Sequence, residues 1–360
     1  MKGPPRPFET PCGLLRMRGF LRRVVLGLDP RTLFHVAKGP RVKPWDDGFG
    51  NKARCVLSLL LLTACAPSIQ PMEPAVEQPR LTDTAFLAAD GTNLPIAITP
   101  SQGATRAVIL ALHGFNDYSN AFAEPALDWA QQGIVTVALD QRGFGRTSRR
   151  GIWAGSDTMI ADARALAQAA RQRWPDLPIT LVGESMGASA ALLASLRPDP
   201  APVDRVVLLA PAVWGRETLG MFGAASLWLL AHSLPWLEVT PQNLNIAPSD
   251  NIEMLRALGR DPLVIKRTRI DAIYGLVELM SLAQAAAPDL ALPALVLWGG
   301  REELIPDAAQ SRFNADLPPE LTRIETLASG YHMLLRDLDS EPARQLVTDW
   351  ALQGARGVAD

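Results

Sequence analysis

The sequence predicts an α/β fold in which a mostly parallel sheet has helices on both faces and carries a helical cap insertion. From about residue 81, short apolar segments of strand length alternate with segments of helical periodicity. Such alternation is typical of parallel sheets, whose buried strands are joined by helices. One interval without a good strand, residues 213–290, interrupts it. We expect this interval to fold over the carboxyl ends of the strands as the cap.

The expected elements follow one another along two stretches of body, residues 81–212 and 291–354. Ligands of such sheets bind beyond the carboxyl ends of the strands, so functional residues are expected in the segments that follow them. Strands are expected at residues 107–112, 134–139, 179–182, 206–209, 294–298 and 323–327, and helices at 156–174 and 341–352, among others.

The segment before this domain reads as a processing signal. Lys52 and Arg54 precede an apolar run at residues 55–62, which ends in Leu-Thr-Ala-Cys at Cys65. The run is too short to cross a bilayer, but it suits the core of a signal peptide. The order resembles a bacterial lipoprotein signal, which implies a lipid on Cys65 and a membrane anchor. An N-terminal anchor that is never cleaved is the alternative.

The lipoprotein interpretation assigns each part of the N-terminal region. Residues 51–65 are the expected signal peptide and lipobox, and residues 66–80 a Pro-rich tether. Residues 1–50 lack periodicity, so we expect translation to start after Met1. Cys65 is then the one cysteine that survives processing, and no internal disulfide is possible. Its neighbour Ala66 resembles the pattern of lipoproteins sent to the outer membrane, so we expect a protein of the bacterial cell envelope.

Charge and residue spacing argue against two classes of partner. Residues 1–54 carry 12 Lys and Arg against 4 Asp and Glu, whereas the rest carries 23 against 33. A net charge of −10 after residue 54, with Lys266 as the only lysine after residue 52, is unfavourable for binding nucleic acid. No cysteine or histidine cluster has metal-ligand spacing. We therefore expect no nucleic-acid partner, no metal and no organic cofactor.

A candidate nucleophile lies between a predicted strand and a small-residue helix. Gly183 and Gly187 flank Ser185 in a G-x-S-x-G pentapeptide, as a tight strand-to-helix turn requires. Such a turn would lift the hydroxyl clear of the sheet. The pentapeptide alone is common by chance, so Ser185 is either a nucleophile or a hydroxyl in a glycine-rich turn, and its partners must decide.

A serine nucleophile needs a histidine base that a carboxylate orients. Three histidines follow Cys65. His332 comes directly after the last predicted strand, which places it at the functional end of the sheet. His232 lies in the apolar part of the cap, where a satisfied structural histidine is expected. His113, followed by Gly114, is expected to support the loop near the serine rather than to act as a base.

The orienting carboxylate should lie between Ser185 and His332 in chain order. A predicted strand runs into two glycines that are followed by Glu302, Glu303 and, later, Asp307. Two adjacent carboxylates cannot both point at one imidazole from a single turn. We choose Glu302 as the acid, with Glu303 as the alternative.

Five ordered motifs carry a family resemblance: "LHGFND", "LDQRGFGRTS", "GESMGA", "LWGGREELIP" and "GYHMLLRD". Over roughly residues 83–352 the chain resembles α/β-hydrolases, especially the monoacylglycerol lipase and lysophospholipase-like group, which includes serine aminopeptidase-type hydrolases. The resemblance implies Ser185 as nucleophile, His332 as base and Glu302 as acid, where the family usually has Asp. It also implies an oxyanion hole formed by the backbone N–H groups of Phe115 and Met186.

These residues together predict hydrolysis of carboxylic esters through an acyl-enzyme. The lipid anchor and apolar cap favour a monoacylglycerol or lysophospholipid substrate. A small-ester esterase, an aminopeptidase-like amidase and a non-catalytic scaffold lipoprotein of the same fold remain alternatives. Asp140 and Arg142 are expected to support a structural turn, and Glu184 to support the loops around the serine.

Overall fold

The computed structural model describes residues 66–240 and 246–353. The predictions for residues 1–50, for the signal peptide at 51–65 and for lipidation of Cys65 lie outside the described residues. The strands are β1 (Arg80–Leu81), β2 (Ala85–Leu87), β3 (Asn93–Thr99), β4 (Ala107–Leu112), β5 (Ile134–Leu139), β6 (Ile179–Glu184), β7 (Arg205–Leu209), β8 (Glu238–Val239), β9 (Thr268–Arg269), β10 (Ala294–Gly299) and β11 (Thr322–Leu327). The helices are η1 (Ser119–Phe122), α3 (Ala123–Gln131), α4 (Ser156–Arg173), α5 (Met186–Ala194), α6 (Arg216–Ser233), α7 (Ile252–Arg260), α8 (Ile270–Ala286), η2 (Ala287–Asp289), α9 (Asp307–Asp316) and α10 (Glu341–Leu352).

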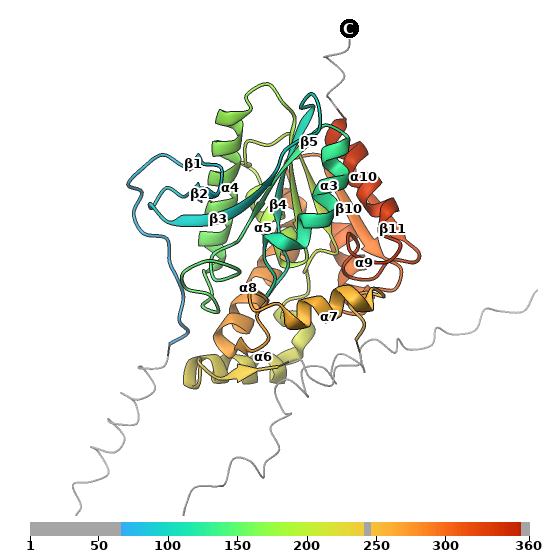
Figure 1. Ribbon diagram of the computed structural model, residues 1–360. Helices are drawn as coiled ribbons and strands as arrows, with labels where there is room; N and C mark the ends of the chain where they lie inside the picture. The colour runs from blue at the N-terminus through green and yellow to red at the C-terminus, as the bar shows by residue number, and fades with distance from the viewer. Residues whose placement is uncertain (1–65, 241–245, 354–360) are drawn as a thin grey trace, which may run out of the picture.

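A nine-stranded sheet forms the centre of the molecule, in the order β1-β2-β3-β5-β4-β6-β7-β10-β11 (Figure 1). The strands from β5 to β11 in this order are parallel, as the sequence predicts. Each of the six predicted strands is present, with bounds that differ by at most two residues. The antiparallel strands β1, β2 and β3 were not predicted, because they are short or of mixed polarity and carry no clear pattern.

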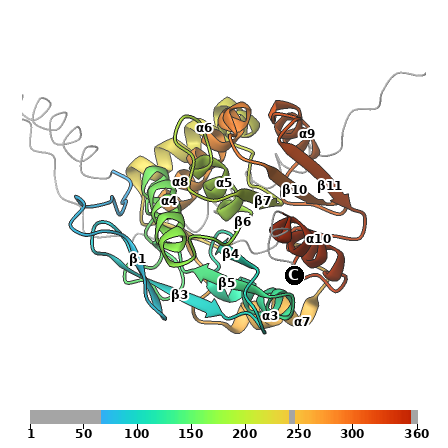
Figure 2. The same ribbon diagram turned by 90° about the horizontal axis from the view of Figure 1, so that it is seen from above.

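Two apolar cores lie on opposite faces of the sheet, and the alternating side chains of β4 contribute to both. Successive side chains of a strand point to opposite faces. Val108, Leu110 and Leu112 therefore join the core under α4, α5 and α8, whereas Ile109 and Ala111 join the core under α3 and α10. Figure 2 shows these two helical layers on either side of the sheet. The central strands β4, β5, β6 and β10 are buried over their whole length, which explains their continuous apolar sequences.

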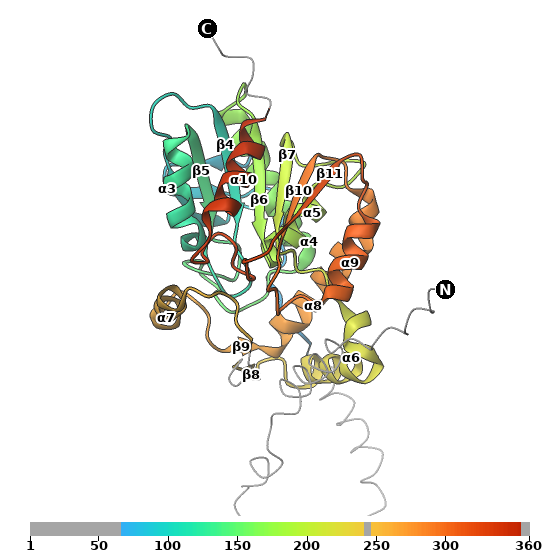
Figure 3. The same cartoon turned by 90° about the vertical axis from the view of Figure 1, so that its right-hand side faces the viewer.

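The interval predicted as a cap, residues 213–290, divides into two parts. Helices α6 and α7 and the short antiparallel pair β8–β9 lie beyond the carboxyl ends of the strands (Figure 3). Helix α8 packs both on α5 of the body and on α6 of the cap and buries residues along its whole length. The last helix of the interval therefore connects the cap to the body.

One segment within the described residues, Ile270–Asp289, is long and apolar enough to cross a membrane. More than half of its most apolar window is buried inside the molecule, and core helices commonly pass this test of length and composition. We interpret it as a core helix.

The predicted tether, residues 66–80, lies against the body instead of standing free of it. The backbone N–H of Ser68 donates to Asp271 Oδ2 at 3.1 Å. Gln70 donates through its backbone to Trp153 O at 2.8 Å, and its buried side chain donates to Arg149 O at 2.9 Å. The chain therefore enters the fold beside the start of α8, next to the cap.

Candidate active site

Ser185 occupies a strained turn between β6 and α5. Its φ of 55° is unusual for a residue with a side chain, and such conformations persist where the surrounding structure enforces them. A Cβ on Gly183 would lie 2.3 Å from Gly187 O, and one on Gly187 would lie 2.1 Å from Leu112 O. Both positions therefore require glycine. The Ser185 side chain stands at the carboxyl end of β6 and is partly exposed.

The loop after β4 passes close to this turn. A Cβ on Gly114 would lie 3.5 Å from Ser185 Cβ, so the backbone of this loop lies against the Ser185 turn. The ring of Phe115 packs edge-on against Phe144 and Trp153, with centroid distances of 5.7 and 6.3 Å. These contacts fix the backbone of the predicted oxyanion donor Phe115. The other predicted donor, Met186, is the first residue of α5.

Glu302 and His332 form a buried hydrogen-bonded pair. His332 lies in the loop between β11 and α10, and Glu302 lies in the loop between β10 and α9. His332 Nδ1 is 2.7 Å from Glu302 Oε2, and the two side chains are 5% and 1% exposed. The second carboxylate oxygen of Glu302 accepts hydrogen bonds from the backbone N–H groups of Leu304 and Ile305, at 2.6 and 3.1 Å. The carboxylate is therefore held from both sides.

The interaction between Glu302 and His332 lowers the pKa of the carboxyl group and raises that of the imidazole. Burial opposes ionisation of Glu302, but the charge and hydrogen bond of His332 outweigh it and lower the pKa of Glu302. Burial likewise opposes protonation of His332, but the charge of Glu302 and the hydrogen bond between them raise the pKa of His332 above its usual range. An imidazole arranged in this way suits a general base whose protonated form a carboxylate stabilises.

The other candidate residues have structural partners. Glu303 is exposed and accepts from Ala247 N at 3.0 Å, whereas Glu302 is the carboxylate bound to His332. His113 is fully buried, with Nδ1 2.8 Å from Gly114 O and Nε2 3.1 Å from Gln141 N, and burial lowers its pKa. His232 stacks on Trp228 in the cap, with ring centroids 4.4 Å apart. The histidine that is hydrogen-bonded to Glu302 is His332.

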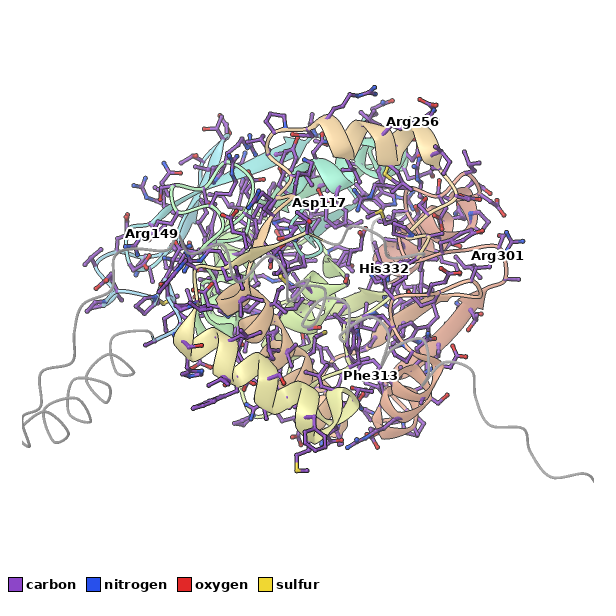
Figure 4. All side chains as sticks on the ribbon, turned by 90° about the horizontal axis from the view of Figure 1, so that it is seen from below. Asp117, Arg149, Arg256, Arg301, Phe313 and His332 are labelled. Carbon is purple, nitrogen blue, oxygen red and sulfur yellow. The ribbon has the colours of Figure 1, made fainter. Side chains whose placement is uncertain are left out.

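A second buried charge cluster lies beside the site, and two of its members were missed. Arg336 donates to Asp117 Oδ2 and to Glu184 Oε1, each at 2.7 Å. Figure 4, which looks onto the cap side, labels His332 and Asp117 near the middle of this face. Glu184 was expected to support neighbouring loops, whereas Asp117 and Arg336 were not singled out. Their signal was present, since both lie inside quoted motifs, "LHGFND" and "GYHMLLRD".

The predicted structural turn after β5 also contains a buried cation. Arg142 donates to Asp90 at 2.8 Å and to Asp162 at 2.6 Å. Asp140 accepts from Ser119 N and from the side chain of Arg146. Within the described residues, no group of three His, Cys, Asp or Glu side chains could hold a metal ion.

Known proteins resemble this chain over most of the described fold. The model of a family described as serine aminopeptidase, S33, matches residues 103–339. A monoacylglycerol lipase of Mycolicibacterium smegmatis is 25% identical over 274 residues, covering 74% of this chain and 94% of that protein. A monoglyceride lipase of Homo sapiens is 25% identical over 255 residues, covering 69% and 83%.

Two solved structures share the fold. A soluble variant of monoglyceride lipase from Saccharomyces cerevisiae has a TM-score of 0.63 at 17% identity, covering 79% of this chain and 96% of that one. Monoacylglycerol lipase of Paleococcus ferrophilus has a TM-score of 0.59 at 21% identity, covering 72% and 98%. Identities this low establish a common fold and leave the choice of substrate to other observations.

Proposed function

This chain belongs to the serine aminopeptidase S33 family of α/β-hydrolases, and on that premise we propose that it hydrolyses monoacylglycerols or lysophospholipids through Ser185, His332 and Glu302. It is a carboxylic ester hydrolase, as its relatives indicate. The observation that carries the proposed site is the 2.7 Å hydrogen bond between the buried Glu302 carboxylate and His332. This pair lies at the same end of the sheet as the strained Ser185 turn.

The reaction proceeds by acyl transfer in two steps. Ser185 Oγ attacks the ester carbonyl carbon while His332 Nε2 accepts the hydroxyl proton. The negative oxygen of the tetrahedral intermediate accepts hydrogen bonds from the N–H groups of Phe115 and Met186. His332 then gives its proton to the leaving alcohol, which forms the acyl-enzyme. Water deprotonated by His332 attacks the acyl carbon, and the proton returns to Ser185 as the fatty acid leaves.

Two observations support a lipid ester over a small one. The sequence relatives reported above are named as monoacylglycerol or monoglyceride lipases. The cap over the strand ends exposes large apolar side chains on and just after α6: Met221, Phe222, Trp228, Leu229, Leu234 and Trp236. An exposed apolar surface of this kind is typical of sites that meet lipid or a partner. A monoacyl substrate presented at a membrane suits both observations.

We also propose that the protein is a lipoprotein anchored through Cys65, most simply in the outer membrane. Ser68, three residues after Cys65 in the sequence, donates its backbone N–H to Asp271 at the start of α8. A lipid on Cys65 would therefore lie close to the cap. In this arrangement the anchor and the apolar side chains of α6 would reach the same membrane surface.

Turnover of p-nitrophenyl esters from acetate to palmitate, together with monoacylglycerol in detergent, tests the reaction and the chain length. We expect hydrolysis that increases toward the longer chains and that Ser185→Ala abolishes. A fluorophosphonate probe should label the parent protein and leave Ser185→Ala unlabelled. Turnover confined to acetate would favour a small-ester esterase. Folded parent protein with neither turnover nor labelling would favour the scaffold alternative.

Cell fractionation tests the anchor. Cys65→Ser should release the protein from the membrane fraction, whereas the matched variant Cys55→Ser, in the preceding apolar run, should leave it there. The mass of the mature N-terminal peptide should show a diacylated Cys65. A peptide from residues 1–50, or membrane retention of Cys65→Ser, would contradict the anchor.

A further inference from the structure

Arg336 is a buried cation held between two buried carboxylates. Its side chain is 7% exposed, and those of Asp117 and Glu184 are 8% and 2% exposed. Each carboxylate accepts one hydrogen bond from a different terminal nitrogen of the guanidinium, at 2.7 Å. Taking three charges out of water is costly. Hydrophobic side chains of similar volume would usually stabilise such a place equally well, so stability alone does not explain the cluster.

The three partners come from the three loops that carry the proposed reacting groups. Asp117 lies two residues after Phe115 in the loop after β4. Glu184 ends β6 and directly precedes Ser185. Arg336 lies four residues after His332, before α10. One planar guanidinium therefore connects the oxyanion loop, the nucleophile turn and the histidine loop.

Further contacts hold Arg336 itself in place. Its backbone carbonyl accepts from Asn251 Nδ2 at 3.0 Å, and its backbone N–H donates to Met333 O at 2.8 Å. Its neighbour Asp337 accepts from Ser249 Oγ at 2.6 Å and from Tyr331 N at 2.7 Å. These contacts fix the histidine loop to the segment that leads into α7. The guanidinium of Arg336 then contacts the other two loops.

We propose that Arg336 is a positioning residue for the ester hydrolysis, which holds the oxyanion loop, Ser185 and His332 in register through Asp117 and Glu184. This proposal rests on the proposed function. Ester hydrolysis requires the nucleophile, the base and the oxyanion donors to meet one carbonyl group within a few tenths of an ångström. A shift of about 1 Å between such groups lowers the rate about 100-fold.

The cluster also acts on His332 through its charges. The charged groups that influence His332 are Glu302, Glu184 and Arg336; the pKa of His332 is raised by both carboxylates and lowered by Arg336. Removing the Glu184 charge should therefore move the acid limb of the pH–rate profile to lower pH. Removing the Arg336 charge should move it to higher pH.

The test compares Arg336→Met, Arg336→Lys and Glu184→Gln in the full chain, with Arg142→Met as the matched control. Arg142 is also a buried arginine, 6% exposed, between two carboxylates, but its partners Asp90 and Asp162 lie outside the loops of the site. We expect Arg336→Met to lower kcat about 100-fold with little change in KM, and Arg336→Lys to recover part of it. Arg142→Met should lower the melting temperature but leave kcat of the folded enzyme within threefold.

A triple variant that removes all three charges of the cluster serves as a second test, in case Arg336→Met does not fold. The triple variant Arg336→Met, Asp117→Asn, Glu184→Gln leaves no buried charge unpaired, and Glu184→Gln alone keeps an oxygen acceptor for Arg336. We expect the triple variant to fold and to show the same loss of kcat. Parental kcat in the triple variant, or in Arg336→Met, would overturn the proposal. Turnover retained by Ser185→Ala would instead overturn the proposed function itself.

Discussion

Glu302→Gln is expected to slow ester turnover about 10⁴-fold while leaving the fold intact. The surroundings of Glu302 decide how the new amide would sit. The backbone N–H groups of Leu304 and Ile305 point at one carboxylate oxygen, so the glutamine oxygen takes that place. Its NH₂ group then takes the place of Glu302 Oε2, which lies 2.7 Å from His332 Nδ1.

The magnitude follows from the tautomer that this orientation imposes. An amide NH₂ donates and cannot accept, so Nδ1 must carry no proton and the single proton of neutral His332 moves to Nε2. That nitrogen then cannot accept the proton of Ser185. The corresponding change in a well-studied serine protease triad lowers kcat about 10⁴-fold, which is about 5 kcal/mol of transition-state stabilisation.

The assay is kcat for p-nitrophenyl butyrate, with circular dichroism and thermal melting as checks of folding. Glu303→Gln is the matched control, because Glu303 is adjacent and exposed and contacts Ala247. Its kcat should stay within twofold of the parent. Should Glu302→Gln keep more than a tenth of the parental kcat, or Glu303→Gln be the variant that loses it, the assignment of the acid is wrong.

Three further predictions concern pH, sterics and the cap surface. The pKa of His332 is raised, and the base must be unprotonated to act. On acidification, log(kcat/KM) should therefore fall with unit slope, with a midpoint above the ordinary histidine pKa of 6.5. A midpoint below 6.5 would contradict this. Gly187→Ala places a Cβ 2.1 Å from a backbone oxygen and should destabilise the fold by about 3 kcal/mol, whereas Gly259→Ala, with open space around it, should not reduce the melting temperature. In a Cys65→Ser background, Leu229→Ser should weaken co-sedimentation with phospholipid vesicles about fivefold, which is the effect of losing about 1 kcal/mol of apolar burial. The control is Leu127→Ser, which is equally exposed at 56% but lies on α3, and it should have no effect. Equal effects of the two substitutions would contradict a membrane contact at α6.

Local pattern predicted the body of the fold well, because buried parallel strands have continuous apolar sequences. It failed where burial depends on distant packing. Helix α8 falls within the predicted cap interval, and its packing on α5 as well as on α6 was not predicted. The segment around Gln70 was predicted as a Pro-rich tether, and the burial of Gln70 and its contact with Trp153 were not predicted. Neither contact leaves a trace in the nearby sequence.

The sequence by itself determined the chemistry that the site can carry. Close packing demands glycine at Gly183, against the turn itself, and at Gly187, against Leu112 of β4, and the sequence shows both glycines within five consecutive residues. The scarcity of histidine then singles out His332. Tertiary structure decided which groups meet. Glu302 rather than Glu303 faces His332, because the backbone after β10 turns one carboxylate inward and the next outward.

Tertiary structure also decided what surrounds the reacting groups. Arg336 contacts Asp117 across 219 residues and Glu184 across 152. Contacts between residues so far apart depend on strand order, which brings the ends of β4 and β6 and the loop after β11 to one edge of the sheet. A local sequence encodes the conformation of its own turn, but the meeting of three turns exists only once the sheet has formed.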